Sequence, residues 1–174
     1  MIHVMLDLET WGTEPGCDIR SIGAVVFDPE SLNVLDTSFY QAVSGGEQYG
    51  LVRDPNTVEW WDNQSEEARS AFTNPVHILH GLNEFSIWYG MLGDPAEVTL
   101  WCNGPQFDEV ILKAAYKACE AKHPWHYRAP RDFRTIMEVA GWPEVKRAGT
   151  YHNALDDAIT QAIGVIEAYR ILKG

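Results

Sequence analysis

Positive charge is scarce in this sequence: 13 lysines and arginines stand against 25 aspartates and glutamates, which gives a formal net charge of −12. Such a chain repels a polyanion at long range, which argues against a protein that coats nucleic acid along its length. An enzyme that grips a few nucleotides at one end is not excluded, because bound divalent cations invert the local field at a carboxylate cluster. Several basic residues fall in the second half of the chain and are compatible with a local phosphate-holding patch: Lys113, Lys117, Lys122, Arg128, Arg131, Arg134, Lys146 and Arg147. A solvated helix face explains Lys113 and Lys117 equally well.

Cysteine is rare, and long apolar runs are absent. Cys17, Cys102 and Cys119 are an odd number without paired metal-ligand spacing, which fits reduced thiols of a cytosol better than a disulfide framework or a structural zinc site. No apolar run approaches about 18 residues, and the N-terminus enters a strand-like segment without a basic leader. We therefore expect a soluble, unsecreted, cytoplasmic protein with no membrane partner.

Linkers, internal repeats and low-complexity segments are missing as well. The 45% of hydrophobic residues supply enough apolar surface for one core. We therefore expect residues 1–174 to form a single domain.

Hydrophobic patterning predicts an α/β fold. Apolar or alternating runs over 2–8, 19–27 and 34–42, joined by short turns, predict an antiparallel meander. Helical spacing follows around 57–71 and over 79–92, then a strand over 98–102, a helix after the Asn103-Gly104-Pro105 break, and helices over 133–140 and 153–172. The stripe predicted to be buried in the helix after the break is Val110, Ile111, Ala114, Ala115 and Cys119. Together these elements predict a mixed sheet with helices on its faces.

Two carboxylates end the first predicted strand. Asp7 and Glu9 are two residues apart, so both side chains leave the same face of the strand. Carboxylates this close repel one another unless positive charge lies between them, and a divalent cation with oxygen ligands supplies it. A strand end that simply emerges into solvent is the more common reason for an isolated Asp-x-Glu.

The remaining acidic candidates open helices. Asp108 follows a strand and a Gly-Pro break, and taken alone it is explained by favourable interaction with the helix dipole. His152, Asp156 and Asp157 fall at the start of the last helix. Individually each signal is weak, but together they supply the carboxylates and the potential general base that a two-metal phosphoryl-transfer site needs.

In combination, these motifs resemble the DEDDh group of exonucleases, the DnaQ-like superfamily with the ribonuclease H-like fold. Asp7-Leu8-Glu9-Thr10 matches its first motif, Asn103-Gly104-Pro105-Gln106-Phe107-Asp108 its second, and His152 with Asp157 its third. The segments Asp7–Thr13, Ser21–Val25 and Thr57–Trp61 are similar to a phage-type branch that includes exodeoxyribonuclease VIII-like and 3′→5′ exoribonuclease-like proteins. The resemblance implies a mixed central sheet, with an antiparallel meander plus parallel strands, flanked by helices.

The resemblance also implies roles for the site residues. Asp7, Glu9 and Asp157 hold the metal ion that activates water, while Asp7 and Asp108 hold a second ion beside the leaving 3′ oxygen. Mg²⁺ or Mn²⁺ suits this oxygen shell. His152 takes the proton from the water. Asp157 is preferred over Asp156 on the family's spacing alone.

Aromatic faces and the first motif are the candidates for substrate binding. Base stacking contributes about 1–3 kcal/mol per base without reading sequence, and Trp11 or the Trp60-Trp61 pair could supply it. One member of that pair is as easily a core residue, so Trp11 is the better candidate. In the family the segment Leu8 to Trp11 commonly touches the 3′ end. The substrate-binding candidates are Leu8, Thr10, Trp11, Trp61, Asn103 and Phe107.

The hypothesis is therefore a two-metal 3′→5′ exonuclease that releases nucleoside 5′-monophosphates from single-stranded 3′ ends, with DNA slightly ahead of RNA. One alternative is an exoribonuclease that trims short RNA or tRNA ends. Others are a catalytically silent ribonuclease H-like binding module and a hydrolase of free nucleotides. Homodimers occur among proteins of the family, so a homodimer is compatible with the resemblance.

Overall fold

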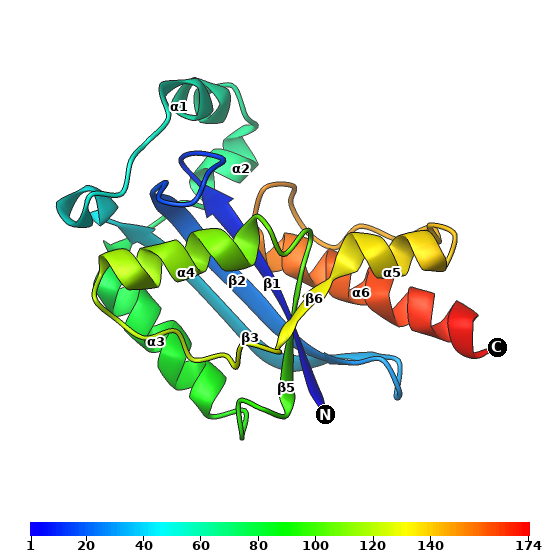
Figure 1. The fold of residues 1–174 in the computed structure, drawn as a ribbon. Coiled ribbons are helices and arrows are strands. Elements are labelled where there is room, and N and C mark those ends of the chain that lie inside the picture. The colour runs from blue at the N-terminus through cyan, green and yellow to red at the C-terminus, as the bar shows by residue number, and fades with distance from the viewer.

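A six-stranded mixed sheet forms the centre of the computed structural model, which describes all residues 1–174. The strand order is β4-β3-β2-β1-β5-β6 (Figure 1). The central strand, β1 (Ile2–Thr10), pairs antiparallel with β2 (Ile19–Asp28) and parallel with β5 (Val98–Cys102). The meander continues into β3 (Asn33–Ser44), and two short parallel strands complete the edges, β4 (Val76–His77) and β6 (Pro130–Asp132).

Helices cover both faces of this sheet (Figure 1). On one face lie α3 (Ile78–Gly90) and α4 (Asp108–Ala118), and on the other lie α5 (Phe133–Val139) and α6 (Ala154–Lys173). Two short helices, α1 (Pro55–Asp62) and α2 (Glu66–Ser70), stand beyond the C-terminal end of β1 and follow a 3-10 turn (Gly46–Tyr49). The predicted ribonuclease H-like arrangement is confirmed. None of the helices combines the length and apolarity needed to span a bilayer.

Alternation along β1 divides the core between the two faces. Val4, Leu6 and Leu8 join the larger hydrophobic cluster with α3 and α4. Met5 joins the smaller cluster with α6. Because side chains alternate along a strand, Asp7 and Glu9 lie on the α6 side of the sheet.

One glycine sets how closely α6 approaches the sheet. Gly23 of β2 pairs with Asp7, and a Cβ added there would lie 2.2 Å from the carbonyl carbon of Ala154 and 2.3 Å from the amide nitrogen of Leu155. These distances are far inside van der Waals contact. Only a residue without a side chain lets α6 begin directly beside the acidic end of β1.

Three details of the sequence-based prediction need correction. The helical stretch around 57–71 is two helices, because the Ser65 side chain accepts a hydrogen bond from the Ala68 amide and begins a new helix. In α4 the buried stripe includes Leu112 and Tyr116, whereas Val110 and Ala114 are only partly buried. The edge strands β4 and β6 have two and three residues, too few for a recognisable pattern.

Candidate active site

Five predicted residues converge at the C-terminal end of β1. The strand carries Asp7 and Glu9, Asp108 is the first residue of α4, and His152 and Asp157 flank the start of α6. Ligand atoms of Glu9, His152 and Asp157 all lie within 4.8 Å of one another. Three segments that are far apart in the sequence thus meet at one point.

Asp108 is fixed to the strand that carries the first motif. Its Oδ1 accepts a hydrogen bond from the Leu8 amide at 3.1 Å, across 100 positions of sequence, and the residue is 2% exposed. Burial raises the pKa of Asp108 to about 7, although the Leu8 amide and the charge of Arg134 oppose that rise. Favourable interaction with the helix dipole is therefore not its only role, since the carboxylate also joins α4 to β1.

Asp7 has a neutral partner, Gln161 of α6, that the sequence analysis missed. The Gln161 side-chain amide donates to Asp7 Oδ1 at 2.7 Å, while its buried Oε1 has no hydrogen-bond partner. Burial, followed by the charge of Asp108, raises the pKa of Asp7 well above its ordinary value. The only sequence signal for Gln161 is its position one helical turn after Asp157.

Glu9 lies in the cluster with Asp157 and takes part in none of the ion pairs of the structure. Burial, followed by the negative charge of Asp157, raises the pKa of Glu9 to about 8, and only the charge of Arg20 opposes this shift to a useful degree. A carboxylate whose pKa is raised in this way lacks a sufficient countercharge. A divalent cation fits the donor set, because oxygen ligands converge from several elements and one buried amide oxygen is free.

His152 is held by its backbone and by its ring. The residue has a φ of 60°, in the left-handed region, and its amide donates to Asp157 Oδ2 at 3.0 Å. The ring packs edge-on against Trp60, with centroids 4.9 Å apart. A strained backbone at a candidate general base is consistent with a site whose geometry is fixed by its surroundings.

The two adjacent aspartates point to different partners. Asp156 Oδ2 accepts a hydrogen bond from the Thr150 amide at 2.7 Å, which commits it to the preceding loop. Asp157 forms an ion pair with Arg147 and shares a cluster with Glu9 and His152. The geometry favours Asp157 as the metal ligand, and the assignment stays a prediction. From the sequence, Arg147 was named only as one of the basic residues of a candidate phosphate-holding patch, because only the fold shows that it reaches Asp157.

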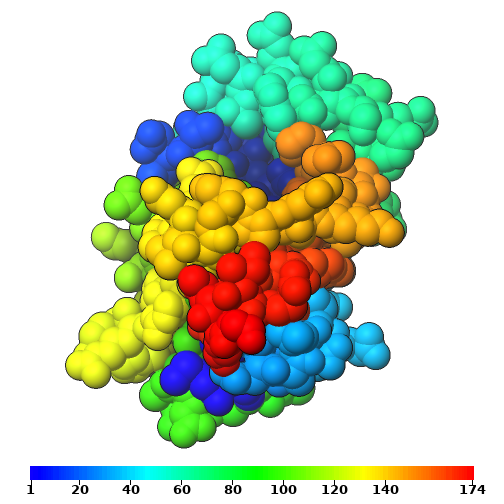
Figure 2. All heavy atoms as spheres, turned by 90° about the vertical axis from the view of Figure 1, so that its right-hand side faces the viewer, coloured from blue at the N-terminus to red at the C-terminus, as the bar shows by residue number.

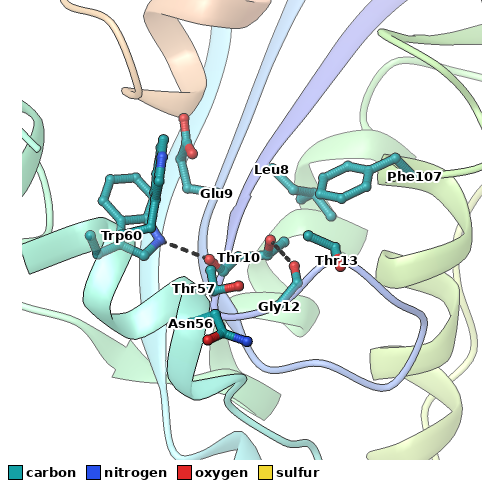
Figure 3. Close-up of a pocket in the computed structure, with 10 residues that line it drawn as sticks. Leu8, Glu9, Thr10, Gly12, Thr13, Asn56, Thr57, Trp60 and Phe107 are labelled. Atoms are coloured by element: carbon teal, nitrogen blue, oxygen red, sulfur yellow. Dashed lines mark hydrogen bonds between the residues drawn. The ribbon is translucent and has the colours of Figure 1, made fainter. Parts of the chain in front are cut away.

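A cavity of about 410 Å³ opens beside the carboxylates (Figure 3). Trp60 stands on one side, and Leu8 and Phe107 stand on the other. Trp60 is 43% exposed, whereas Trp61 is 3% exposed and donates from its indole nitrogen to the Thr10 carbonyl at 2.9 Å. The full lining is Leu8, Glu9, Thr10, Gly12, Thr13, Asn56, Thr57, Trp60, Trp61 and Phe107.

Trp11 does not line this cavity, contrary to the preference for it as the stacking residue. Its ring packs against Phe72, at 5.8 Å between centroids, and near the Arg20 guanidinium. The residue after the first motif turns back toward α2, and the α1 helix supplies the exposed indole of Trp60 instead. Figure 2 shows the recess from the side, with the N-terminal segment at its floor and the segments around residues 55–70 and 145–152 around it.

A second cavity of about 390 Å³ shares Leu8 and Phe107 with the first. Its other lining residues are Asp7, Asn103, Gly104, Gln106, Asp108 and Arg134. Of the predicted substrate-binding residues, Asn103 lies here, and Leu8, Thr10, Trp61 and Phe107 line the first cavity. The carboxylates of β1 thus lie at the junction of two adjacent cavities.

Sequence comparison identifies relatives over most of the chain. Residues 2–168 match the family described as the 3′-5′ exoribonuclease Rv2179c-like domain. A protein of Enterobacteria phage T4 named exodeoxyribonuclease is 30% identical over 125 residues, which are 64% of this chain and 54% of that protein. The chain therefore spans about half the length of this relative.

Structure comparison identifies the same fold in solved nucleases. The nuclease domain of 3′hExo, a DEDDh family member bound to rAMP, aligns with a TM-score of 0.61 at 16% identity and covers 99% of this chain and 92% of that chain. E. coli Exonuclease I in complex with a dA16 oligonucleotide aligns with a TM-score of 0.64 at 16% identity, covering 99% of this chain and 42% of that chain. At this level of identity the similarity establishes the fold.

Proposed function

Because the chain belongs to the 3′-5′ exoribonuclease Rv2179c-like family, we propose that it is a 3′→5′ exonuclease that releases nucleoside 5′-monophosphates from single-stranded nucleic acid. The observation that carries this proposal is the convergence of Asp7, Glu9, Asp108, His152 and Asp157 beside a nucleotide-sized cavity. Four carboxylates and a histidine beside such a cavity have the chemistry for phosphodiester hydrolysis. We further propose that residues 1–174 form one exonuclease domain.

Two divalent cations, Mg²⁺ or Mn²⁺, are the proposed cofactors. Asp7, Glu9 and Asp157 would hold one ion, and Asp7 and Asp108 the other. When bound, such ions neutralise the carboxylates and polarise the phosphodiester for attack. The raised pKa values of Glu9 and Asp108 support the proposal, since carboxylates that are destabilised without a countercharge are well suited to bind one.

The protein's own groups perform the proton transfer and the positioning. We assign His152 as the general base, which takes the proton of the attacking water on an imidazole nitrogen. Its ring is restrained on one side by Trp60, and its amide is bonded to Asp157. These contacts, together with the ring of Trp61 at 6.1 Å between centroids, keep the imidazole beside the carboxylates.

The terminal nucleotide is assigned to the first cavity. A cavity of about 410 Å³ is of the size that encloses one small ligand. The exposed face of Trp60 on one side and the apolar surfaces of Leu8 and Phe107 on the other are suited to a base and its sugar. With the terminal nucleotide in this cavity, we expect removal of nucleotides from an end rather than cleavage within a strand.

The names of the relatives support both ribose and deoxyribose in the substrate. The family description names an exoribonuclease, and the phage relative is named an exodeoxyribonuclease. RNA and DNA differ by the 2′-hydroxyl, and Asn56 and Thr57 provide polar groups in the first cavity that could meet it. We propose single-stranded 3′ ends of either polymer as substrates, acted on in the cytoplasm, where the three free, buried cysteines stay reduced.

The proposal is tested with 5′-labelled single-stranded DNA and RNA of matched sequence, incubated with Mg²⁺, Mn²⁺ or EDTA. We expect stepwise shortening from the 3′ end that stops with EDTA and with Asp7→Ala, and release of nucleoside 5′-monophosphates. Asp62→Ala, which alters an exposed carboxylate of α1 outside both cavities, is the control that keeps activity. Fragments from internal cleavage, metal-independent cleavage or binding without cleavage would each contradict the proposal. Light scattering on the same sample tests the homodimer that the family resemblance allows.

A further inference from the structure

The second cavity contains one cationic side chain among carboxylates. Arg134, in the first turn of α5, lines it together with Asp7 and Asp108. The ion pairs of the structure involve Arg53, Lys113, Arg147, Arg170 and Lys173, and Arg134 forms none. An arginine that stays unpaired in a chain with 25 acidic residues and lies beside two of them is available for an external anion.

The guanidinium of Arg134 is oriented by a single neutral contact. Its Nε donates to Asn103 Oδ1 at 3.1 Å, and its other four N–H groups have no acceptor in the protein. Gly104 has a φ of 104°, and a Cβ added there would lie 3.7 Å from the guanidinium carbon. The loop after β5 therefore both aims the arginine and leaves its outer edge open, in the geometry that binds phosphate oxygens in pairs.

We propose that Arg134 binds the phosphate on the 5′ side of the penultimate nucleotide of the substrate. The inference rests on the proposed function, which puts the terminal nucleotide in the first cavity and the scissile phosphate beside the carboxylates. Because the two cavities share Leu8 and Phe107, the next nucleotide along the strand enters the second cavity. The 5′ phosphate of this nucleotide then lies across the second cavity from the scissile bond. Arg134 is the cationic side chain that lines this cavity.

Dinucleotides with and without that phosphate isolate the contact. Two substrates are compared at equal Mn²⁺: a thymidine dinucleotide with a 5′-phosphate and the same dinucleotide with a 5′-hydroxyl. Wild-type protein should cleave the phosphorylated dinucleotide with a kcat/KM on the order of 10- to 100-fold higher, the range expected for a charge-assisted phosphate contact. Arg134→Met should bring the ratio of the two kcat/KM values close to one, because any effect of the lost charge on Asp108 falls equally on both substrates, whereas Arg134→Lys should keep part of the preference.

A matched variant and a binding measurement complete the test. Arg170→Met removes an exposed arginine of α6, paired with Glu167 away from both cavities, and should keep the wild-type preference. With catalysis blocked by Asp7→Ala, oligonucleotide binding is measured at several salt concentrations. Arg134→Met should reduce the slope of the logarithm of the binding constant against the logarithm of salt concentration by the equivalent of about one phosphate contact.

The failure of this inference differs from the failure of the proposed function. Cleavage of neither dinucleotide nor longer strands by wild-type protein would overturn the proposed function. Cleavage of both dinucleotides with the same preference in wild-type and Arg134→Met protein would overturn the role of Arg134 alone. An equal loss on both substrates would also overturn it, because it would show that Arg134 acts on the site rather than on the 5′ phosphate.

Discussion

Adjacent aspartates at the start of α6 show how one residue step separates two roles. Asp156 holds the Thr150 amide, whereas Asp157 meets Arg147 and the His152 amide and shares a cluster with Glu9. In the sequence the two are chemically equivalent, and only the family spacing distinguished them. Their geometric difference depends on the path of the loop before the helix, which is not encoded in a local pattern.

This difference predicts contrasting effects of substitution. Asp157→Asn should lower kcat/KM on a single-stranded oligonucleotide by more than about 100-fold, because it removes a charged ligand from the proposed metal site. Asp156→Asn should lower it only a few-fold and reduce the melting temperature, because it weakens the loop contact. Steady-state kinetics with Mn²⁺ titration, together with thermal melts, distinguishes the two variants. Equal losses of activity would overturn the assignment of Asp157.

The convergence of the five motif residues was the most predictable feature of the candidate site. Asp7, Glu9, Asp108, His152 and Asp157 lie in motifs whose order and spacing can be read along the chain. Partner residues such as Gln161 and Arg147 could not be identified in this way, because their contacts form only when α6 packs on β1. Sequence reveals chemistry that is repeated in a family more readily than it reveals contacts made by packing.

At the scale of elements, the position of α1 was the main surprise. The indole of Trp61 donates to the Thr10 carbonyl, and the Asp54 amide donates to the Trp11 carbonyl at 2.7 Å. These bonds dock the start and the end of α1 on the C-terminal end of β1, and Trp60 faces the cavity as a result. Helical spacing predicted a helix here but not which side chain would face the site, because docking is decided by tertiary hydrogen bonds.

The close contact between β2 and the start of α6 predicts that adding one methyl group at Gly23 strongly affects stability and activity. Gly23→Ala introduces a Cβ about 2.2 Å from backbone of Ala154, so α6 must move away from β1. We expect a loss of about 1–3 kcal/mol in the free energy of unfolding, as overpacking typically gives. We also expect a drop in kcat, because His152 and Asp157 move with the start of the helix. Urea unfolding and oligonucleotide hydrolysis measure the two effects.

Gly90→Ala is the matched control for that substitution. Gly90 ends α3 at the surface, and a Cβ there meets no atom within 4 Å. It should leave activity unchanged and alter stability by no more than about 1 kcal/mol, in the stabilising direction. Wild-type activity in Gly23→Ala would contradict the close approach of α6 as a requirement of the site.

For the molecule as a whole, buried acids make stability depend on pH and on cations. The pKa of Glu9 is raised from 4.5 to about 8, and that of Asp108 from 3.8 to about 7. A carboxyl with a raised folded-state pKa contributes stability that is fully present below its unfolded pKa and is lost as the pH rises through the folded pKa. The metal-free protein therefore loses stability between about pH 4 and pH 8 from these groups.

The expected outcome is a melting temperature that falls in EDTA as the pH is raised from 5 to 8.5, with recovery when Mn²⁺ is added at the upper end. Each kcal/mol lost corresponds to roughly 2–4 °C for a chain of this size. Glu9→Gln should flatten the pH dependence in EDTA and reduce the recovery with Mn²⁺. Glu138→Gln, on the exposed surface of α5, should change neither. A melting temperature in EDTA that rises over this pH range would contradict the burial of these acids.

The overall architecture was largely predictable, because the strong periodicities lie in the long elements. The meander of β1, β2 and β3 and the helices α3 to α6 follow from alternation and helical spacing. Such patterns do not predict the two-residue β4, the three-residue β6 or the break between α1 and α2, because segments this short cannot show a hydrophobic periodicity. What sequence could not supply was the arrangement of short connecting elements around the end of β1, and these elements form the two cavities.

In the loop before α6, backbone amides donate hydrogen bonds to side chains rather than to the backbone of a neighbouring strand. The amides of Ala148, Thr150 and His152 donate to Thr160, Asp156 and Asp157 respectively. Because β1 pairs with a strand on each side, its amide hydrogens are expected to exchange with solvent far more slowly than those of this loop, which depend on three side-chain contacts. We therefore expect the strand that carries Asp7 and Glu9 to stay formed while the loop that carries His152, the proposed general base, opens and recloses without global unfolding.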